Sequence, residues 1–211
     1  MKPSGTKSRI LSTTIQLLNT KGVSNVKMRD VSGALSMSIG DLTYHYPKWE
    51  ALMDDIFGAF QSDVDELYLS FPSDITEVAR YIGQIYDIQM RYAFFFADFY
   101  VFFQLYPKYE GIKERFFLER MKIMRDALQR LIVKKFLFPQ DEQHNYDLLV
   151  KNTWLLLSGW YGFSMMLKNT KYTFTKEEFF LSIWNLYVSH LTPRGKAIVR
   201  RSYLSAAISV R

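Results

Sequence analysis

The stretch that decides the fold is residues 27–47, which read KMRDVSGALSMSIGDLTYHYP. Its apolar residues recur three and four positions apart, in two sets separated by a polar break at residues 36–38. The two sets are Met28, Val31 and Leu35, then Ile39, Leu42 and Tyr46. Each set covers only about two helical turns. Two short helices joined by about three residues predict a helix-turn-helix unit.

A longer helix precedes this unit. Leu11, Ile15 and Leu18 occupy positions i, i+4 and i+7, which places them on one face of a helix. Gly22 follows the last of them and is suited to end the helix, because glycine adopts the backbone conformations of a C-terminal cap without strain. The first part of the chain is therefore predicted to be a three-helix bundle.

The third helix of this bundle is predicted to begin at Ser38 and to end before Pro47. The Ser38 hydroxyl is spaced to accept from the amide of Asp41, whose carboxylate can reach back, which is a capping box. If the apolar set faces inward, the opposite face presents residue types that read DNA grooves or phosphates. The predicted DNA contacts are Lys27, Ser38, Gly40, Asp41, Thr43, Tyr44, His45 and Lys48.

The charge distribution agrees with this prediction. The chain carries a net charge of +6. Residues 1–49 hold seven basic and two acidic residues, for a net charge of +5, and residues 194–211 hold five basic residues and no acidic one. Residues 50–193 are left with a net charge of −4. A positive excess can simply make a surface soluble, but its segregation to the two ends of the chain favours an anionic partner.

Residues 9–52 also resemble the TetR family of transcriptional repressors. That family has a first helix ending in Gly, an Arg-Asp-apolar triplet, a Ser-x-Gly turn into the third helix, and an aromatic-His-aromatic ending. The matching residues here are Gly22, Arg29-Asp30-Val31, Ser38-Ile39-Gly40, Tyr44-His45-Tyr46 and Glu50-Ala51-Leu52. The resemblance implies that this region binds DNA, and that the rest of the chain binds a small molecule and dimerises.

Four positions depart from the family pattern. Lys27 replaces a Thr, so the second helix lacks a capping hydroxyl and gains a cation that can meet phosphate. Ser36 replaces a Gly, so it must adopt a left-handed conformation or form a different turn. Thr43 replaces a frequent Tyr, and Trp49 replaces a Lys whose charge is moved to Lys48. We expect DNA binding to survive these changes, but not the family's sequence preference.

The rest of the chain is predicted to be a bundle of long helices followed by a basic tail at residues 194–211. The expected helices cover residues 49–70, 74–91, 93–106, 110–137, 141–169 and 175–191. The expected fold is all-α, with a helix-turn-helix domain at residues 1–48 and a ligand-binding and dimerisation domain at residues 49–211.

Residues 92–103 are aromatic on all sides, so most of this helix must be buried. Most of its rings are expected in the core, and the remainder are expected to line a cavity. Asp98 either faces solvent or serves a ligand as hydrogen-bond acceptor or counter-charge. The candidate effector contacts are Phe95, Asp98, Phe99, Phe102 and Tyr161, and they predict an apolar effector that is aromatic or cationic.

The predicted helix at 141–169 has too many apolar residues for a single buried stripe. One of its faces is therefore expected to pack on a second copy of the chain, together with the following helix. Gly159 and Gly162 would permit a close helix approach. The candidate interface residues are Trp154, Leu157, Tyr161, Phe180, Trp184 and Tyr187.

Catalytic and cofactor sites are not expected. The chain has no cysteine, and its three histidines, His45, His144 and His190, lie far apart in the sequence. Nucleotide-binding, metalloprotease and serine-hydrolase motifs are absent. The N-terminus lacks the apolar core of a signal peptide, and the uncharged run at 152–167 is shorter than the roughly 20 residues that span a bilayer. These features predict a cytoplasmic protein without metal, cofactor or membrane partner.

The sequence thus predicts a ligand-responsive transcriptional regulator that acts as a homodimer on a double-stranded DNA operator. The choice of repressor over activator follows from the family resemblance alone. An alternative from another class is a helical adaptor that binds protein or anionic surfaces through its basic ends. Specific, salt-sensitive binding to a duplex would discriminate between the two hypotheses.

Overall fold

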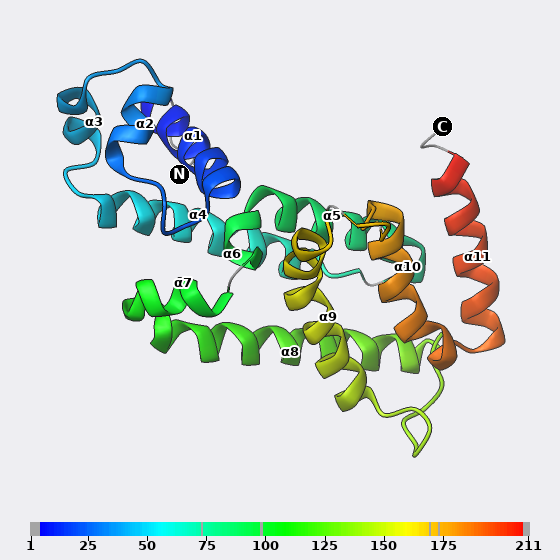
Figure 1. Ribbon diagram of the computed structural model, residues 1–211. Helices are drawn as coiled ribbons and strands as arrows, with labels where there is room; N and C mark the ends of the chain where they lie inside the picture. Colours follow the sequence, from blue (N-terminus) through cyan, green and yellow to red (C-terminus); the bar gives the residue numbers. More distant parts are fainter. Residues whose placement is uncertain (1–4, 73, 98, 169, 173, 209–211) are drawn as a thin grey trace.

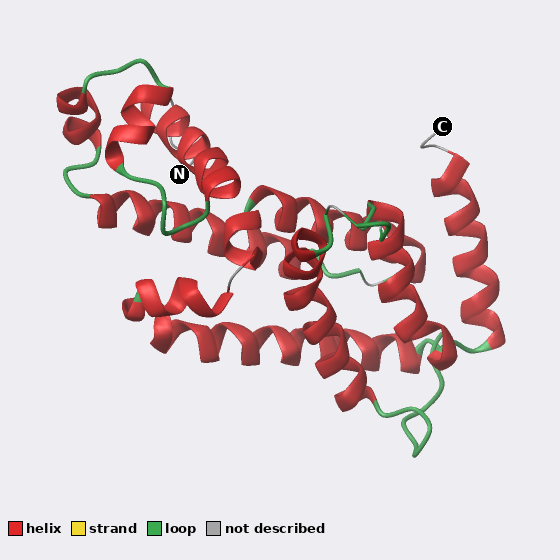
Figure 2. Cartoon of the chain, viewed as in Figure 1, coloured by secondary structure: helices red, strands yellow, loops and turns green. Residues whose placement is uncertain are grey.

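The computed structural model describes residues 5–72, 74–97, 99–168, 170–172 and 174–208, with side chains described except at 99, 113, 115, 116 and 201–208. Within these ranges the chain forms eleven α-helices and no strand (Figure 2). The all-α prediction is therefore confirmed. Figure 1 shows a group of short helices at one end of an elongated helical body, with the last helix, α11, at the other end.

The first four helices are α1 (Thr6–Lys21), α2 (Met28–Ala34), α3 (Ile39–His45) and α4 (Trp49–Leu69). Helix α1 ends at Gly22, which has a positive φ of 84° and donates its amide to the carbonyl of Leu18, as the sequence predicts. Helices α2 and α3 follow as two short elements joined by a tight turn. The three-helix arrangement predicted for this region is present, and we call α1 to α3 the head.

The turn between α2 and α3 is built on Ser36, whose φ is 52°. The Ser36 amide donates to the carbonyl of Gly33, and the Met37 amide donates to the carbonyl of Ser32. This pair of bonds is a Schellman ending, in which the residue after the cap is left-handed. Of the two outcomes expected for a serine at this position, the chain adopts the left-handed one.

The inward face of α3 differs in one residue from the prediction. Leu42 and Tyr46 are buried, at 0% and 2% exposure, but Ile39 is 47% exposed. Ile39 is the first residue of a seven-residue helix that packs mainly against α2, so about half of its surface is left in solvent. The expectation that all three residues face inward was therefore wrong at Ile39.

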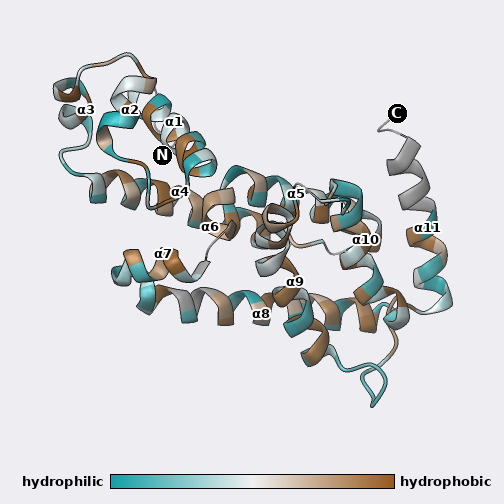
Figure 3. Ribbon diagram, viewed as in Figure 1, coloured by the Kyte–Doolittle hydropathy of each residue, from teal (hydrophilic) through white to brown (hydrophobic). Residues whose placement is uncertain are grey.

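The body continues from α4 without a linker. Its helices are α5 (Val78–Arg91), α6 (Ala93–Ala97), α7 (Phe99–Leu105), α8 (Glu110–Val133), α9 (Tyr146–Met166), α10 (Lys176–Tyr187) and α11 (Pro193–Ile208). Short 3₁₀ turns occupy Ile75–Glu77, Pro107–Tyr109 and Val188–His190. Hydrophobic and hydrophilic bands alternate along α8 in Figure 3, as in an amphipathic helix that packs on one side.

Three expected helix boundaries need correction. The helix predicted at 93–106 is two helices, α6 and α7. Helix α8 stops at Val133 rather than at residue 137, because Lys135 is left-handed with a φ of 59° and closes a second Schellman ending. Helix α9 begins at Tyr146 rather than at residue 141, because the Asn145 side chain caps it by accepting from the amide of Leu148.

The hydrophobic core runs continuously from the head into the body. Ile10, Val31 and Leu42 of the head belong to the same buried cluster as Phe57 and Phe60 of α4. Two hydrogen bonds of Asn19 in α1 add to this packing. Its side-chain nitrogen donates to the carbonyl of Arg91 at 2.9 Å, and its side-chain oxygen accepts from the amide of Phe94 at 2.8 Å. Helix α1 is thereby bonded to the end of α5 and the start of α6.

Candidate DNA-binding and effector sites

Helix α3 presents an exposed face at the end of the molecule (Figure 1). Tyr44 is 85% exposed, and Gly40 and Asp41 are exposed beside it. Thr43 and His45 are half-buried, and the rings of Tyr44 and His45 meet edge to face at 5.3 Å. Gly40, Asp41 and Tyr44 thus make up the exposed face of α3.

Ser38 and Asp41 hold the start of α3 together. The Ser38 hydroxyl accepts 3.0 Å from the Asp41 amide and donates 2.7 Å to the Asp41 carboxylate, which also accepts from the Ser38 amide. The predicted capping box is therefore formed. Thr43 is also engaged locally, because its hydroxyl donates 2.9 Å to the carbonyl of Gly40.

The start of α2 compensates for the missing hydroxyl at Lys27. The Lys27 amide donates 2.9 Å to the carboxylate of Asp30, which also pairs with Lys21 at 2.8 Å. The hydrogen bond from Lys21 and then the Lys27 amide lower the pKa of Asp30, so this carboxylate stays ionised at the helix N-terminus. The Lys27 side chain itself is left exposed.

The end of α3 is attached to α4 and to the aromatic part of the body. Tyr46 donates 2.9 Å to the carboxylate of Asp55, and burial together with this bond raises the pKa of Tyr46. Trp49 donates its indole N–H 3.0 Å to the hydroxyl of Tyr106, which explains how an indole is used where the TetR pattern has a lysine. Lys48 lies between these anchors and is exposed.

The aromatic candidates for effector binding lie mostly in packed core. Phe95 is 3% exposed and Phe102 is 1% exposed, and their ring centroids lie 4.7 Å apart. Phe57 and Phe60 of α4 pack on them, and the space that these rings enclose is too small for a water molecule. Tyr161 is half-buried on α9. Asp98 lies outside the described residues, and the Phe99 side chain is not among those described.

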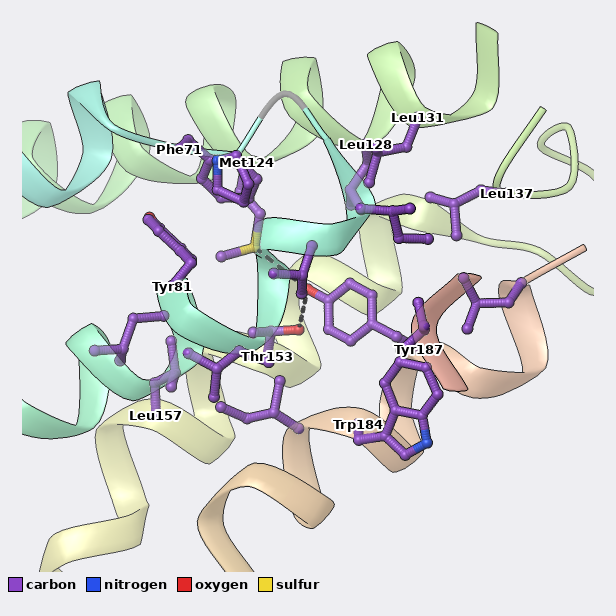
Figure 4. A pocket seen from close by; sticks show the side chains of 18 residues that line it. Phe71, Tyr81, Met124, Leu128, Leu131, Leu137, Thr153, Leu157, Trp184 and Tyr187 are labelled. Carbon is purple, nitrogen blue, oxygen red and sulfur yellow. Dashed lines mark hydrogen bonds between the residues drawn. The ribbon is translucent and has the colours of Figure 1, made fainter. Parts of the chain in front are cut away.

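An apolar cavity of about 80 Å³ lies instead in the far half of the body (Figure 4). Helices α5, α8, α9 and α10 form its walls, with contributions from the segment before α5 and from the start of α11. Its lining residues are Phe71, Pro72, Ile75, Val78, Tyr81, Ile82, Ile85, Met124, Leu128, Leu131, Leu137, Thr153, Leu157, Ile183, Trp184, Tyr187, Leu191 and Val199. None of these side chains is charged.

Sequence reasoning missed this cavity. The available signal was the set Val78, Ile82 and Ile85 with Tyr81, which repeats at i, i+3, i+4 and i+7 on α5. That pattern identifies an inward face but does not distinguish a filled core from a cavity. Of the residues singled out from the sequence, Leu157, Trp184 and Tyr187 line the cavity, although they were proposed for the dimer interface.

Polar groups in the cavity are few and mostly bonded to one another. Thr153 donates 2.8 Å to the carbonyl of Leu149, and its oxygen lies 2.9 Å from the hydroxyl of Tyr187. The Tyr187 hydroxyl also lies 3.8 Å from the sulfur of Met124, and Figure 4 shows these three side chains meeting inside the cavity. Burial raises the pKa of Tyr187 to about 12, so its phenol remains neutral.

The candidate interface residues are buried or half-buried within the single chain. Trp154 packs between Tyr68 and Phe117, Leu157 is buried, and Tyr161, Phe180, Trp184 and Tyr187 are half-buried. Other residues form an exposed apolar stripe along α9 and on α10. We define this stripe by Leu148, Leu155, Phe163 and Met166 of α9 and Leu181 of α10.

The two glycines of α9 have different surroundings. A Cβ added at Gly159 would meet no atom within 4 Å, and this residue lies in line with Leu155 and Phe163 on the stripe. Gly162 lies one turn further along α9, where α6 is beside the helix: a Cβ there would lie 3.5 Å from the carbonyl oxygen of Ala97. Gly162 therefore allows α6 to approach α9 within the same chain.

Two of the histidines that lie far apart in the sequence are brought together. The Nδ1 atoms of His144 and His190 lie 3.3 Å apart where the loop before α9 meets the end of α10. Among the described residues, no group of three or more His, Cys, Asp or Glu side chains is arranged to hold a metal ion. No helix within the described residues is long and apolar enough to cross a membrane.

Comparison with known proteins identifies the fold. A regulator of the TetR family from Marinobacter aquaeolei VT8 superposes with a TM-score of 0.79 at 23% identity, covering 95% of this chain and 98% of that one. A TetR regulator from Haloarcula marismortui gives a TM-score of 0.62 at 12% identity, with 88% and 98% coverage. A transcriptional regulator from Saccharomonospora viridis, solved in complex with choline, superposes with a TM-score of 0.62 at 18% identity. The match covers 88% of this chain and 96% of that one.

Sequence comparison gives the family directly. No curated protein sequence matches the chain significantly. A family model described as TetR, bacterial transcriptional repressor, matches residues 59–199, which is more than half of the chain. This match covers the body, whereas the motifs noted in the sequence lie in the head, so two separate regions indicate the same family. The chain therefore belongs to the TetR family of bacterial transcriptional regulators.

Proposed function

We propose that the protein is a repressor that binds a double-stranded operator as a homodimer and is released by a small apolar effector. Residues 1–48 act as the DNA-binding domain, and residues 49–211 bind the effector and dimerise. The protein works by binding, without a catalytic step, and meets its operator in the cytoplasm. The observation that carries the proposal is the exposed face of α3, on which Tyr44 lies one turn after Gly40, with Lys48 exposed in the turn that follows the helix.

The roles on DNA follow from the position of each residue. Gly40, Thr43 and Tyr44 approach base edges or backbone, and His45 supports Tyr44 through its ring contact. Lys27 and Lys48, the exposed residues that precede α2 and α4, neutralise phosphates. Ser38 and Asp41 serve the interface through the geometry of α3, because their side chains are bonded to one another in the capping box.

A second copy of the chain is proposed to cover the exposed apolar stripe of α9 and α10. Leu155 and Met166 are 72% and 76% exposed, and a row of such residues on one face is costly to leave in water. Gly159 lies within the row and lets a facing helix approach closely. A symmetric dimer formed there presents two α3 helices, which suits an operator with two related half-sites.

The effector is proposed to act by shifting the population of head positions. A ligand that favours one separation of the two heads disfavours the separation required by the operator. The contacts of Asn19 support this coupling, since they attach α1 to α5, and α5 lines the apolar cavity. The choline complex of the Saccharomonospora viridis regulator supports the idea that a protein of this fold can hold a small molecule.

The test is a binding-site selection from a library of random DNA duplexes with the full-length protein. We expect the selected duplexes to share an inverted repeat, and their binding to weaken steeply with salt. The Tyr44→Ala/Lys48→Ala double variant should enrich no motif, while Tyr100→Ala/Lys168→Ala, which changes an exposed tyrosine and an exposed lysine of the body, should enrich the same motif. Failure of the unmodified protein to enrich any motif would overturn the proposal.

A further inference from the structure

Helix α3 carries few side chains that can form a hydrogen bond with a base. Its polar residues are Asp41, Thr43, Tyr44 and His45, and it contains no Arg, Lys, Asn or Gln. Those four absent residue types supply the common paired hydrogen bonds to guanine and adenine in the major groove. The helix therefore has to read bases through a different kind of contact.

The polar residues of α3 differ in their access to a duplex. The Thr43 hydroxyl donates 2.9 Å to the carbonyl of Gly40, so its hydrogen is used within the helix. Thr43 and His45 are half-buried, whereas Asp41 is exposed and Tyr44 is 85% exposed. Asp41 and Tyr44 are thus the two polar side chains of this helix that solvent reaches most freely, and Asp41 is the charged one.

The two carboxylate oxygens of Asp41 have different surroundings. Oδ2 accepts 2.7 Å from the Ser38 hydroxyl and 3.3 Å from the Ser38 amide, and these bonds complete the capping box. Within the described residues, Oδ1 takes part in no hydrogen bond or ion pair. The capping box needs one oxygen and fixes the orientation of the carboxylate, so the other oxygen remains available as an acceptor.

Asp30 shows the same motif with no oxygen left over. It is the third residue of α2, as Asp41 is of α3, and its Oδ2 accepts 2.9 Å from the amide of Lys27. Its Oδ1 pairs with Lys21 of α1 at 2.8 Å. The capping carboxylate of α2 is therefore engaged through both oxygens, whereas that of α3 keeps one oxygen and its charge for a partner outside the chain.

An ionised carboxylate on a helix that enters a DNA groove needs a specific partner. Phosphates repel it, and it loses hydration on entering the groove. A base amino group compensates for both costs, because a hydrogen bond to a charged acceptor is strong. Cytosine presents its N4 amino group in the major groove. Adenine also presents an amino group there, but its N7 acceptor lies beside that group and repels a carboxylate.

We propose that Asp41 determines specificity, with Oδ1 accepting a hydrogen bond from the N4 amino group of one cytosine in each half-site of the operator. This inference rests on the proposed binding of DNA through α3, and it names the base that the helix reads. Guanine and thymine present the acceptors O6 and O4 in the major groove. The carboxylate of Asp41 therefore repels them, so the residue selects cytosine by exclusion as well as by attraction.

The first experiment is a binding-site selection with the full-length Asp41→Asn variant. The asparagine keeps an oxygen that can accept from Ser38, and it places an amide nitrogen, a donor, where Asp41 has its available acceptor. We expect the unmodified protein to enrich cytosine at one position of each half-site. At that position the variant should enrich a base that presents an acceptor instead, and the rest of the motif should be unchanged.

The second experiment changes the DNA and leaves the protein unmodified. N4-methylcytosine still pairs with guanine, but its methyl group replaces the amino hydrogen that points into the major groove. One such base in a half-site should weaken binding of the unmodified protein by about 10-fold, as expected for one lost hydrogen bond to a charged group. Asp41→Asn should not distinguish cytosine from N4-methylcytosine at this position. Fluorescence anisotropy measures the four affinities.

Asp30→Asn is the matched control, because it changes the capping carboxylate of α2, whose two oxygens are engaged within the head. It should enrich the same motif as the unmodified protein and keep the sensitivity to N4-methylcytosine. Any variant that enriches a motif is folded, so a changed base at one position does not arise from unfolding. A change at that position in both variants would instead reflect the charge of the head.

The outcomes separate this inference from the proposed function. If the unmodified protein enriches an inverted repeat and Asp41→Asn prefers the same base at every position, Asp41 only caps α3 and the inference is overturned, while DNA binding stands. Equal binding of the cytosine and N4-methylcytosine duplexes, or the same change of base in Asp30→Asn, overturns it as well. If the unmodified protein enriches no motif, the proposed function and this inference fail together.

Discussion

Tyr44 and Lys48 are exposed on the same surface, but we expect them to contribute to DNA binding in different ways. Lys48→Ala should lower the magnitude of the slope of log K against log salt by about 0.9 per lost phosphate contact, or about 1.8 for a dimer. Tyr44→Ala should leave this slope nearly unchanged. It should reduce the ratio of the affinity for the selected duplex to the affinity for a random duplex. Fluorescence anisotropy from low to high salt measures both quantities.

The controls for this prediction are exposed residues of the body. Tyr100→Ala and Lys168→Ala should reproduce the slope and the specificity of the unmodified protein. If all four variants gave the same salt slope and the same ratio of specific to random affinity, α3 would not be the recognition element. The adaptor hypothesis would then become the better explanation of the basic ends.

Ser36 and Lys135 are the two described non-glycine residues with a positive φ, and both follow the cap of a helix. The left-handed conformation costs an L-residue about 1–2 kcal/mol, part of which is offset because glycine loses more backbone entropy on folding. Ser36→Gly and Lys135→Gly should therefore each raise the free energy of unfolding by about 0.5–1 kcal/mol. Urea denaturation followed by circular dichroism measures the change.

Ser62→Gly serves as the control for these two substitutions. Ser62 is exposed in the interior of α4, where the backbone is helical, so glycine should lower the free energy of unfolding by about 0.5 kcal/mol. If all three substitutions raised the free energy of unfolding, the left-handed conformation at residues 36 and 135 would not be the cause of the gain in stability.

At the scale of the elements, the exposed apolar stripe of α9 and α10 yields a prediction about assembly. Leu155→Glu places a charge at a position that is 72% exposed, so folding should be preserved. In the proposed dimer, this carboxylate would be buried without a partner, which is costly enough to dissociate the two copies. Sedimentation velocity at micromolar concentration should show a dimer for the unmodified protein and a monomer for the variant.

Leu69→Glu is the matched control for assembly, because Leu69 is 88% exposed at the end of α4 and lies outside the stripe. This variant should sediment as a dimer. A monomeric unmodified protein, or dissociation by both variants alike, would count against α9 and α10 as the interface.

The sequence predicted the helix ends of the head well, because short-range interactions set them, but it predicted the burial of Ile39 wrongly. Short-range chemistry determines the head: Gly22 ends α1, the Ser38 and Asp41 side chains start α3, and Pro47 stops it. Each of these interactions spans at most four residues, so it can be read from the sequence. Ile39 was misplaced because its exposure depends on which neighbour covers it, and that is a tertiary property.

The cavity depends on contacts that are distant in the sequence. Whether the aromatic run at 92–103 forms core or pocket depends on α4, whose Phe57 and Phe60 fill the space against Phe95. The lining of the observed cavity draws residues from Phe71 to Val199, and its volume follows from how α5, α8, α9 and α10 cross. Periodicity predicts the inward face of each of these helices but carries no information on their crossing.

At the scale of the whole molecule, His190 makes stability depend on pH. Burial and then the proximity of His144 lower the pKa of His190 below 6.5, and Asp141 opposes this effect only in part. The folded protein therefore binds fewer protons than the unfolded chain as the pH falls through 6.5. The free energy of unfolding should decrease as the pH is lowered below about 6.5, until the folded pKa is passed.

The His190→Gln variant should show a weaker decrease over the same pH range, because the titrating ring is removed. His45→Gln, which changes the histidine of α3 outside the His144–His190 pair, is the control and should retain the decrease. Thermal unfolding between pH 5 and pH 8 gives the comparison. Identical pH profiles for all three proteins would contradict the assignment to His190.

The uncharged lining of the cavity also has a consequence for how a cell would deliver the signal. A neutral, mostly hydrocarbon molecule that leaves water for this cavity leaves water for a lipid bilayer by the same driving force. Most of the proposed effector would then be dissolved in membranes, and the regulator would respond to the small aqueous fraction in equilibrium with that reservoir. The total amount of lipid would set the dose at which the operator is released, and the response would persist until the reservoir emptied.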